Sequence, residues 1–82
     1  MSQRKGQPYH NLHREFNDDG STALTIRGTK IDGKFAVAVD NHKDIAWFRY
    51  TGTLKATLQY FKRLKDHVSA GNGLPANPLP VS

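Results

Sequence analysis

The sequence contains no cysteine and no apolar run longer than a few residues. The absence of cysteine excludes disulfide bridges and thiolate zinc sites, and it fits a reducing compartment. The lack of long apolar runs excludes a membrane-spanning helix, and the polar residues 1–5 lack the hydrophobic stretch of a signal peptide. We therefore expect a cytoplasmic protein that makes no contact with a membrane.

Acidic residues are also scarce, with 7 Asp+Glu against 12 Lys+Arg in 82 residues, which gives a net charge of +5 and a sequence pI near 9.8. A chain of this length forms one domain with a modest core. The first 20 residues carry three basic and three acidic groups, so the positive excess falls in the segment predicted to fold. This charge favours polyanions or acidic protein surfaces as partners, although net charge also serves solubility alone.

An Asp32-Gly33 pair lies between two alternating segments and predicts a β-hairpin with a two-residue type I′ turn. The turn pairs Ile31 with Lys34, and strand alternation then assigns every side chain to a face. The apolar face of this hairpin carries Leu24, Ile26, Phe35, Val37 and Val39. The opposite face, which we call the outer face, carries Thr25, Arg27, Thr29, Ala36 and Ala38.

A third strand is predicted over residues 44–51, after a polar loop whose length decides which aromatic side chains are buried. A five-residue connection places Ile45 and Trp47 on the core face and leaves Phe48 and Tyr50 outside, and a four-residue connection does the reverse. We favour the first, because it hides the larger apolar pair. A helix over 54–68 follows, capped by Thr53. Its predicted core stripe is Leu54, Leu58, Phe61, Leu64 and Val68.

The expected fold is therefore α+β, a three-stranded antiparallel meander packed on one C-terminal helix. Residues 1–20 form an N-terminal arm, 21–70 the core domain and 71–82 an extended flexible tail. In the arm, Tyr9, Leu12 and Phe16 fall at helical spacing, which predicts a short N-terminal helix. This element order resembles plant AP2 and integrase-arm DNA-binding domains or, with the N-terminal helix, a double-stranded-RNA-binding domain. The resemblance carries over no functional residue, because no motif matches.

Two surfaces have the chemistry to bind nucleic acid. On the outer face an arginine can read a guanine edge and an aromatic ring can stack on an unpaired base. On the helix an exposed stripe of Lys55, Gln59, Lys62, Arg63 and Asp66 can follow a phosphate backbone. The candidate nucleic-acid-binding residues are Thr25, Arg27, Thr29, Phe48, Arg49, Tyr50, Lys55, Lys62 and Arg63. Alternatively, the N-terminal segment or a second copy in a homodimer covers the outer face.

Catalytic chemistry is not indicated, and we expect no enzyme, cofactor or metal site. His10 and His13 are three residues apart, but no third ligand has diagnostic spacing. The leading hypothesis is a small basic protein that binds DNA or RNA. The alternative is a small protein-interaction module or inhibitor, of the kind that mobile elements encode, which docks on an acidic protein.

Overall fold

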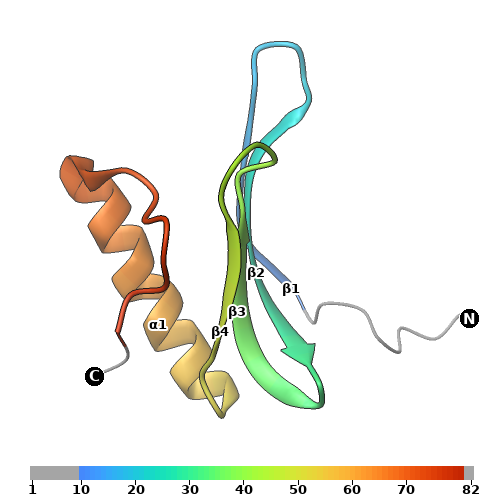
Figure 1. The fold of residues 1–82 in the computed structure, drawn as a ribbon, viewed down its shortest axis with the longest axis vertical. Helices are drawn as coiled ribbons and strands as arrows, with labels where there is room; N and C mark the ends of the chain where they lie inside the picture. The colour runs from blue at the N-terminus through green and yellow to red at the C-terminus, as the bar shows by residue number, and fades with distance from the viewer. Residues whose placement is uncertain (1–9, 81–82) are drawn as a thin grey trace, which may run out of the picture.

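The computed structural model describes residues 10–80, which form an antiparallel sheet with one helix packed against it (Figure 1). The strands are β1 (His10–Phe16), β2 (Thr22–Ile31), β3 (Lys34–Asp40) and β4 (Ala46–Tyr50), and they lie in the order β1-β2-β3-β4. The helix α1 (Leu54–His67) follows and continues as a π-helical turn over Val68–Asn72. The fold is α+β, as predicted, but the meander has four strands instead of three.

The hairpin between β2 and β3 has the predicted turn and register. Asp32 and Gly33 both have positive φ, 53° and 77°, as a type I′ turn requires. Ile31 pairs with Lys34, and Ile26 pairs with Val39. The predicted core face is therefore confirmed at Leu24, Ile26, Val37 and Val39, whereas Phe35 is only partly buried and lies outside the core cluster.

The connection between β3 and β4 has the favoured length of five residues, because Asp40 pairs with Ala46. The side-chain oxygen of Asn41 accepts hydrogen bonds from three successive backbone N–H groups, those of residues 43–45, at 2.9–3.0 Å. This local network satisfies the loop backbone and fixes its length. As predicted, Trp47 packs against the core and Phe48 lies on the outer face.

The prediction of a short N-terminal helix is wrong for the described residues, because His10–Phe16 forms the edge strand β1. Pro8 and Tyr9, where the predicted helix began, lie outside the described residues. Two register irregularities, one after Asn11 and one after Glu15, interrupt the pairing of β1 with β2. Such bulges break the two-residue alternation that identifies a strand in a sequence. The Leu12 and Phe16 spacing is thus compatible with a strand, in which Leu12 packs on the core.

Helix α1 begins where predicted, and the Thr53 hydroxyl accepts a hydrogen bond from the Ala56 N–H at 3.1 Å. Its buried side chains are those of Thr57, Tyr60 and Leu64. The predicted core stripe is therefore wrong at its first two positions, because Leu54 and Leu58 are 46% and 44% exposed. Leu64 is fully buried, and Phe61 and Val68 are partly buried.

Relative to the predicted orientation, the helix is rotated about its axis, because two of its polar side chains form hydrogen bonds in the interior. The Thr57 hydroxyl donates to the carbonyl of Thr53 at 2.8 Å and bonds to the Thr51 hydroxyl at 2.7 Å. The Tyr60 hydroxyl donates to the carbonyl of Leu79 at 2.7 Å. The hydroxyls of Thr57 and Tyr60 are therefore hydrogen-bonded although they are buried. The pattern of apolar residues alone could not predict this orientation of the helix.

The C-terminal segment turns back along the helix (Figure 1). Helical geometry ends at Gly71, whose φ is 91°, as the glycines at 71 and 73 predicted. The indole N–H of Trp47 donates to the carbonyl of Pro75 at 2.9 Å, and Leu74 and Leu79 pack against the core. Residues 73–80 have no regular secondary structure and bend at Ala76 and Asn77, and these contacts hold them over the core. Within residues 10–80 no helix is long and apolar enough to cross a membrane.

Candidate nucleic-acid interface

The outer face of the sheet is open, since α1 and the C-terminal segment both lie against the opposite face (Figure 1). Within residues 10–80, no secondary-structure element is packed over it. The sheet register places its side chains in rows. One row contains Arg27, Ala38 and Phe48, and the next contains Thr29, Ala36 and Tyr50. Ala38 lines a low centre in the first row, whereas Ala36 in the second row is 0% exposed because neighbouring side chains cover it.

Two aromatic rings dominate the β4 side of the outer face. Phe48 and Tyr50 are 44% and 37% exposed, and their rings meet edge to face with centroids 5.2 Å apart. The Tyr50 hydroxyl donates to Asp32 at 3.2 Å, and the Lys34 ammonium lies 5.3 Å from the Tyr50 ring centroid. Desolvation, then the Asp32 hydrogen bond and charge, raise the pKa of Tyr50, so its hydroxyl remains a donor at neutral pH. These contacts hold both rings in place before any ligand binds.

Arg27 and Thr29 occupy the middle of the outer face and are partly buried. Arg27 and Phe48 help to line a shallow, open depression of about 290 Å³ above Ala38. A planar guanidinium and an aromatic ring therefore border the same hollow. This arrangement suits a flat, polar-edged group such as a nucleobase, which can stack on the ring and bond to the guanidinium.

Thr25 lies on the outer face as predicted but does not present its hydroxyl to solvent. Its side chain is 6% exposed, and its hydroxyl bonds to the imidazole Nε2 of His42 at 3.2 Å. His42 has a positive φ of 62°, which turns the loop back toward the sheet. Thr25 therefore supports His42, and His42 is the residue that covers this end of the face.

Arg49 is separated from its two neighbours in β4, because strand alternation places it on the helix side of the sheet, opposite Val37. Arg49 and Arg63 of α1 both act on the charge of Tyr60. Burial raises the pKa of Tyr60 above its ordinary value, and the positive charges of Arg49 and Arg63 partly oppose that rise. Arg49 and Arg63 thus both act on the helix side of the sheet and do not belong to the outer face.

The helix stripe lies on the other side of the molecule from the outer face. Lys62 is roughly 200° around the helix from the buried Tyr60, and Lys55 is on the same exposed side. The predicted site residues therefore divide between two opposite surfaces. Thr25, Arg27, Thr29, Phe48 and Tyr50 lie on the outer face, and Arg49, Lys55, Lys62 and Arg63 lie on the helix side. One straight ligand does not reach both.

Two further basic residues on the outer face are missing from the predicted set. Arg14 of β1 is the cross-strand partner of Thr25, and it was missed because β1 was predicted to be helical. Lys34 pairs with Ile31 and lies beside Tyr50. The hairpin register already placed Lys34 on this face, so the sequence held the signal for it.

Across residues 10–80, no group of three or more His, Asp or Glu side chains is arranged to hold a metal ion. His13 is instead hydrogen-bonded to Glu15, with Nε2 and Oε2 3.0 Å apart at the surface.

Comparison with protein-family models, with curated proteins and with solved structures finds no match for this chain.

Proposed function

We propose that this is a small basic nucleic-acid-binding protein, and that its outer face binds single-stranded DNA or RNA. The observation that carries the proposal is the exposed aromatic pair, Phe48 and Tyr50, beside Arg27 on an uncovered sheet face. Each base has a flat face that can stack on such a ring, and each stacked base contributes about 1–3 kcal/mol. An open sheet carrying exposed aromatics is also one general way of binding unpaired RNA bases.

The width of the sheet favours a single strand over a duplex. Four strands span three inter-strand spacings, which is about 14 Å of backbone before side chains are added. The major groove of B-DNA is about 12 Å wide and admits a helix or a two-stranded ribbon. A four-stranded face does not enter it, whereas a single strand can lie flat across the rows.

The charge of the outer face supports the same proposal. Arg14, Arg27 and Lys34 supply three positive groups on this side of the sheet. The nearby carboxylates of Asp32 and Asp40 accept hydrogen bonds from the Tyr50 hydroxyl and the His42 N–H. The three cations therefore outnumber the two carboxylates, and this excess favours the approach of phosphates. Three phosphate contacts to a single strand imply a log-log salt slope of roughly −2.

Fluorescence anisotropy with a labelled single-stranded oligonucleotide tests this function. We expect Phe48→Ala to weaken binding by about 1–3 kcal/mol, as loss of one stacked base requires. Arg27→Ala should weaken binding and flatten the salt slope by roughly 0.7. Lys62→Ala is the charge-matched comparison on the opposite surface and should change neither value. If Lys62→Ala weakens binding as much as Arg27→Ala, the strand binds to the helix instead.

A second candidate function is a protein-interaction module that uses α1. Leu54 and Leu58 expose nearly half of their side chains on one flank of the helix, with Lys55 and Lys62 beside them. Apolar side chains bordered by lysines fit an acidic protein surface with an apolar centre. Capture from a native lysate with and without nuclease separates the two functions. A single stoichiometric protein that survives nuclease and is lost with Leu58→Asp would favour this second function.

A further inference from the structure

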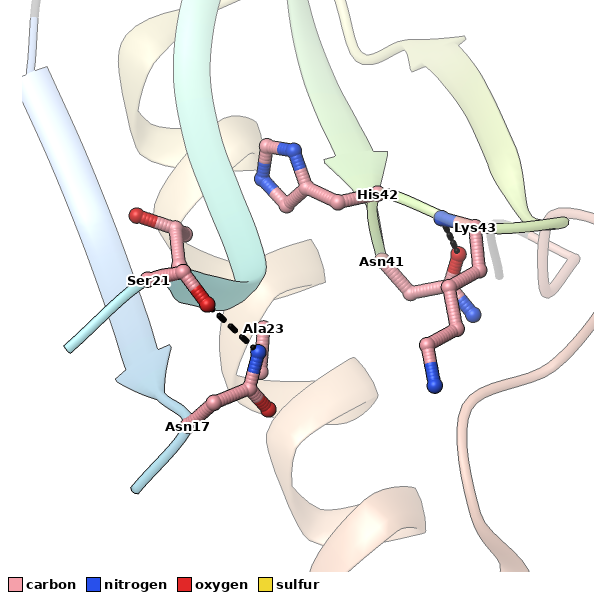
Figure 2. Close-up of a pocket in the computed structure, with 7 residues that line it drawn as sticks. Asn17, Ser21, Ala23, Asn41, His42 and Lys43 are labelled. Carbon is pink, nitrogen blue, oxygen red and sulfur yellow. Dashed lines mark hydrogen bonds between the residues drawn. The ribbon is translucent and has the colours of Figure 1, made fainter. Parts of the chain in front are cut away.

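A pocket of about 460 Å³ lies at one end of the sheet, between the β1–β2 and β3–β4 loops (Figure 2). Its lining consists of Asn17, Ser21, Thr22, Ala23, Asn41, His42 and Lys43, and it includes no carboxylate. His42 bonds to Thr25, an outer-face residue, so the pocket lies beside that end of the outer face. Figure 2 shows His42 and Lys43 on one side of the opening and Asn17 and Ser21 on the other.

Both loops are held in shape by their own hydrogen bonds. In the first, the Asn17 amide donates to the Ser21 hydroxyl at 3.0 Å, and that hydroxyl donates to Asp19 at 2.6 Å. In the second, the N–H of His42 donates to Asp40 at 2.6 Å. The carboxylates of Asp19 and Asp40 therefore bond back into their own loops while keeping their charge, and the pocket walls need little ordering when a ligand enters.

Several hydrogen-bond donors that line the pocket have no partner within residues 10–80. They are the Lys43 ammonium, the Thr22 hydroxyl and one N–H of the Asn17 amide, and the His42 Nδ1 is a further donor in the tautomer whose Nε2 accepts from Thr25. The Lys43 charge forms no ion pair among the described residues. A compact acceptor with several oxygens satisfies this set, and a negative charge on it would complement Lys43.

We propose that this pocket binds a phosphate group. This proposal rests on the proposed function and extends it. A single-stranded nucleic acid lying along the outer face would place a backbone phosphate over the end of that face. A free phosphate, inorganic or on a small molecule, has the same chemistry and is the other source. In either case Lys43 supplies the charge, and Thr22, Asn17 and His42 orient the phosphate oxygens.

An NMR titration tests the pocket, with sodium phosphate replacing sodium chloride at constant ionic strength and pH. Saturable shifts of the Asn17, His42 and Lys43 backbone amides are expected in the wild-type protein. Lys43→Met should weaken phosphate binding about tenfold, the loss of one charge-assisted hydrogen bond. Lys65→Met removes the same charge from the helix side and should leave the affinity unchanged. A second arm repeats both variants with a single-stranded oligonucleotide.

The two arms separate failure of the pocket from failure of the proposed function. Parallel losses with phosphate and oligonucleotide for Lys43→Met support a backbone phosphate in the pocket. Phosphate binding that depends on Lys43, without oligonucleotide binding, supports a free phosphate and overturns the nucleic-acid function. If the oligonucleotide binds and Lys43→Met behaves like Lys65→Met in both arms, the pocket proposal is overturned and the outer-face function stands. If neither ligand binds, both are overturned.

Discussion

Replacing Leu64 or Leu58 with alanine makes the same chemical change at two positions of one helix that differ in burial. Leu64 is fully buried, whereas Leu58 is 44% exposed. Each substitution removes three carbon atoms, worth about 0.8 kcal/mol each when buried. At Leu64 a cavity term adds to this loss, so we expect about 3–4 kcal/mol of destabilisation. At Leu58 roughly half of this burial free energy is lost and no closed cavity forms, so we expect about 1 kcal/mol of destabilisation.

Urea unfolding followed by Trp47 fluorescence and by circular dichroism measures both losses. A domain of this size has a stability of only roughly 4–12 kcal/mol, so the measurement is best made at a temperature near maximum stability. Calorimetry gives an independent check, because each kcal/mol should lower Tm by about 4–8 °C. Equal losses for Leu64→Ala and Leu58→Ala, or a larger loss for Leu58→Ala, would show that the side of the helix carrying Leu54 and Leu58 faces the sheet. The account of the core would then be wrong.

Three other predictions concern the polar contacts of the interior. Thr57→Val keeps the side-chain shape but removes the buried hydroxyl, and it should cost about 1–2 kcal/mol in urea unfolding. Because burial raises the pKa of Tyr60 in the folded state, the unfolded chain loses its proton first, and stability should fall as pH rises above the ordinary value of 10.0. Tyr60→Phe should lessen that alkaline loss while weakening the protein at neutral pH through the lost bond to Leu79; an unchanged alkaline profile would contradict this. Truncation after Gly73 should shift Trp47 emission to longer wavelength, whereas an unaltered spectrum would mean that the C-terminal segment does not cover the indole.

The features that could be predicted from the sequence are those fixed by local chemistry. Asp32-Gly33 specifies the hairpin turn, and the turn then fixes the pairing of Thr25–Ile31 with Lys34–Asp40. Thr53 was identified as the helix cap because its hydroxyl reaches an amide in the first turn. The five-residue loop followed from burying Trp47 and leaving Phe48 outside. The structure has the same arrangement.

The features that could not be predicted depend on contacts between distant segments. Strand β1 carries two bulges, so it lacks the alternation of a regular strand until it is paired with β2. The rotation of α1 depends on Tyr60, whose hydroxyl is satisfied by the carbonyl of Leu79, nineteen residues later. The spacing of apolar residues places Leu58 in the core, because that spacing contains no information about this acceptor.

The candidate site was predicted in part for the same reasons. Arg27, Phe48 and Tyr50 share the outer face because the hairpin register and loop length were both anticipated. Arg49 was grouped with them by sequence proximity, although alternation places it on the helix side. Arg14 was missed because its strand was missed. Errors in the site therefore trace to errors in the fold.

The central claim is that single-stranded nucleic acid lies on the outer face, and intermolecular nuclear Overhauser effects test it most directly. In a complex of the labelled protein with a single-stranded oligonucleotide, the ring protons of Phe48 and Tyr50 should show contacts to base protons. The methyl groups of Leu54 and Leu58, on the other side of the sheet, should show none. Contacts from the leucine methyls without any from the two rings would contradict the claim, as would the absence of a complex at low salt.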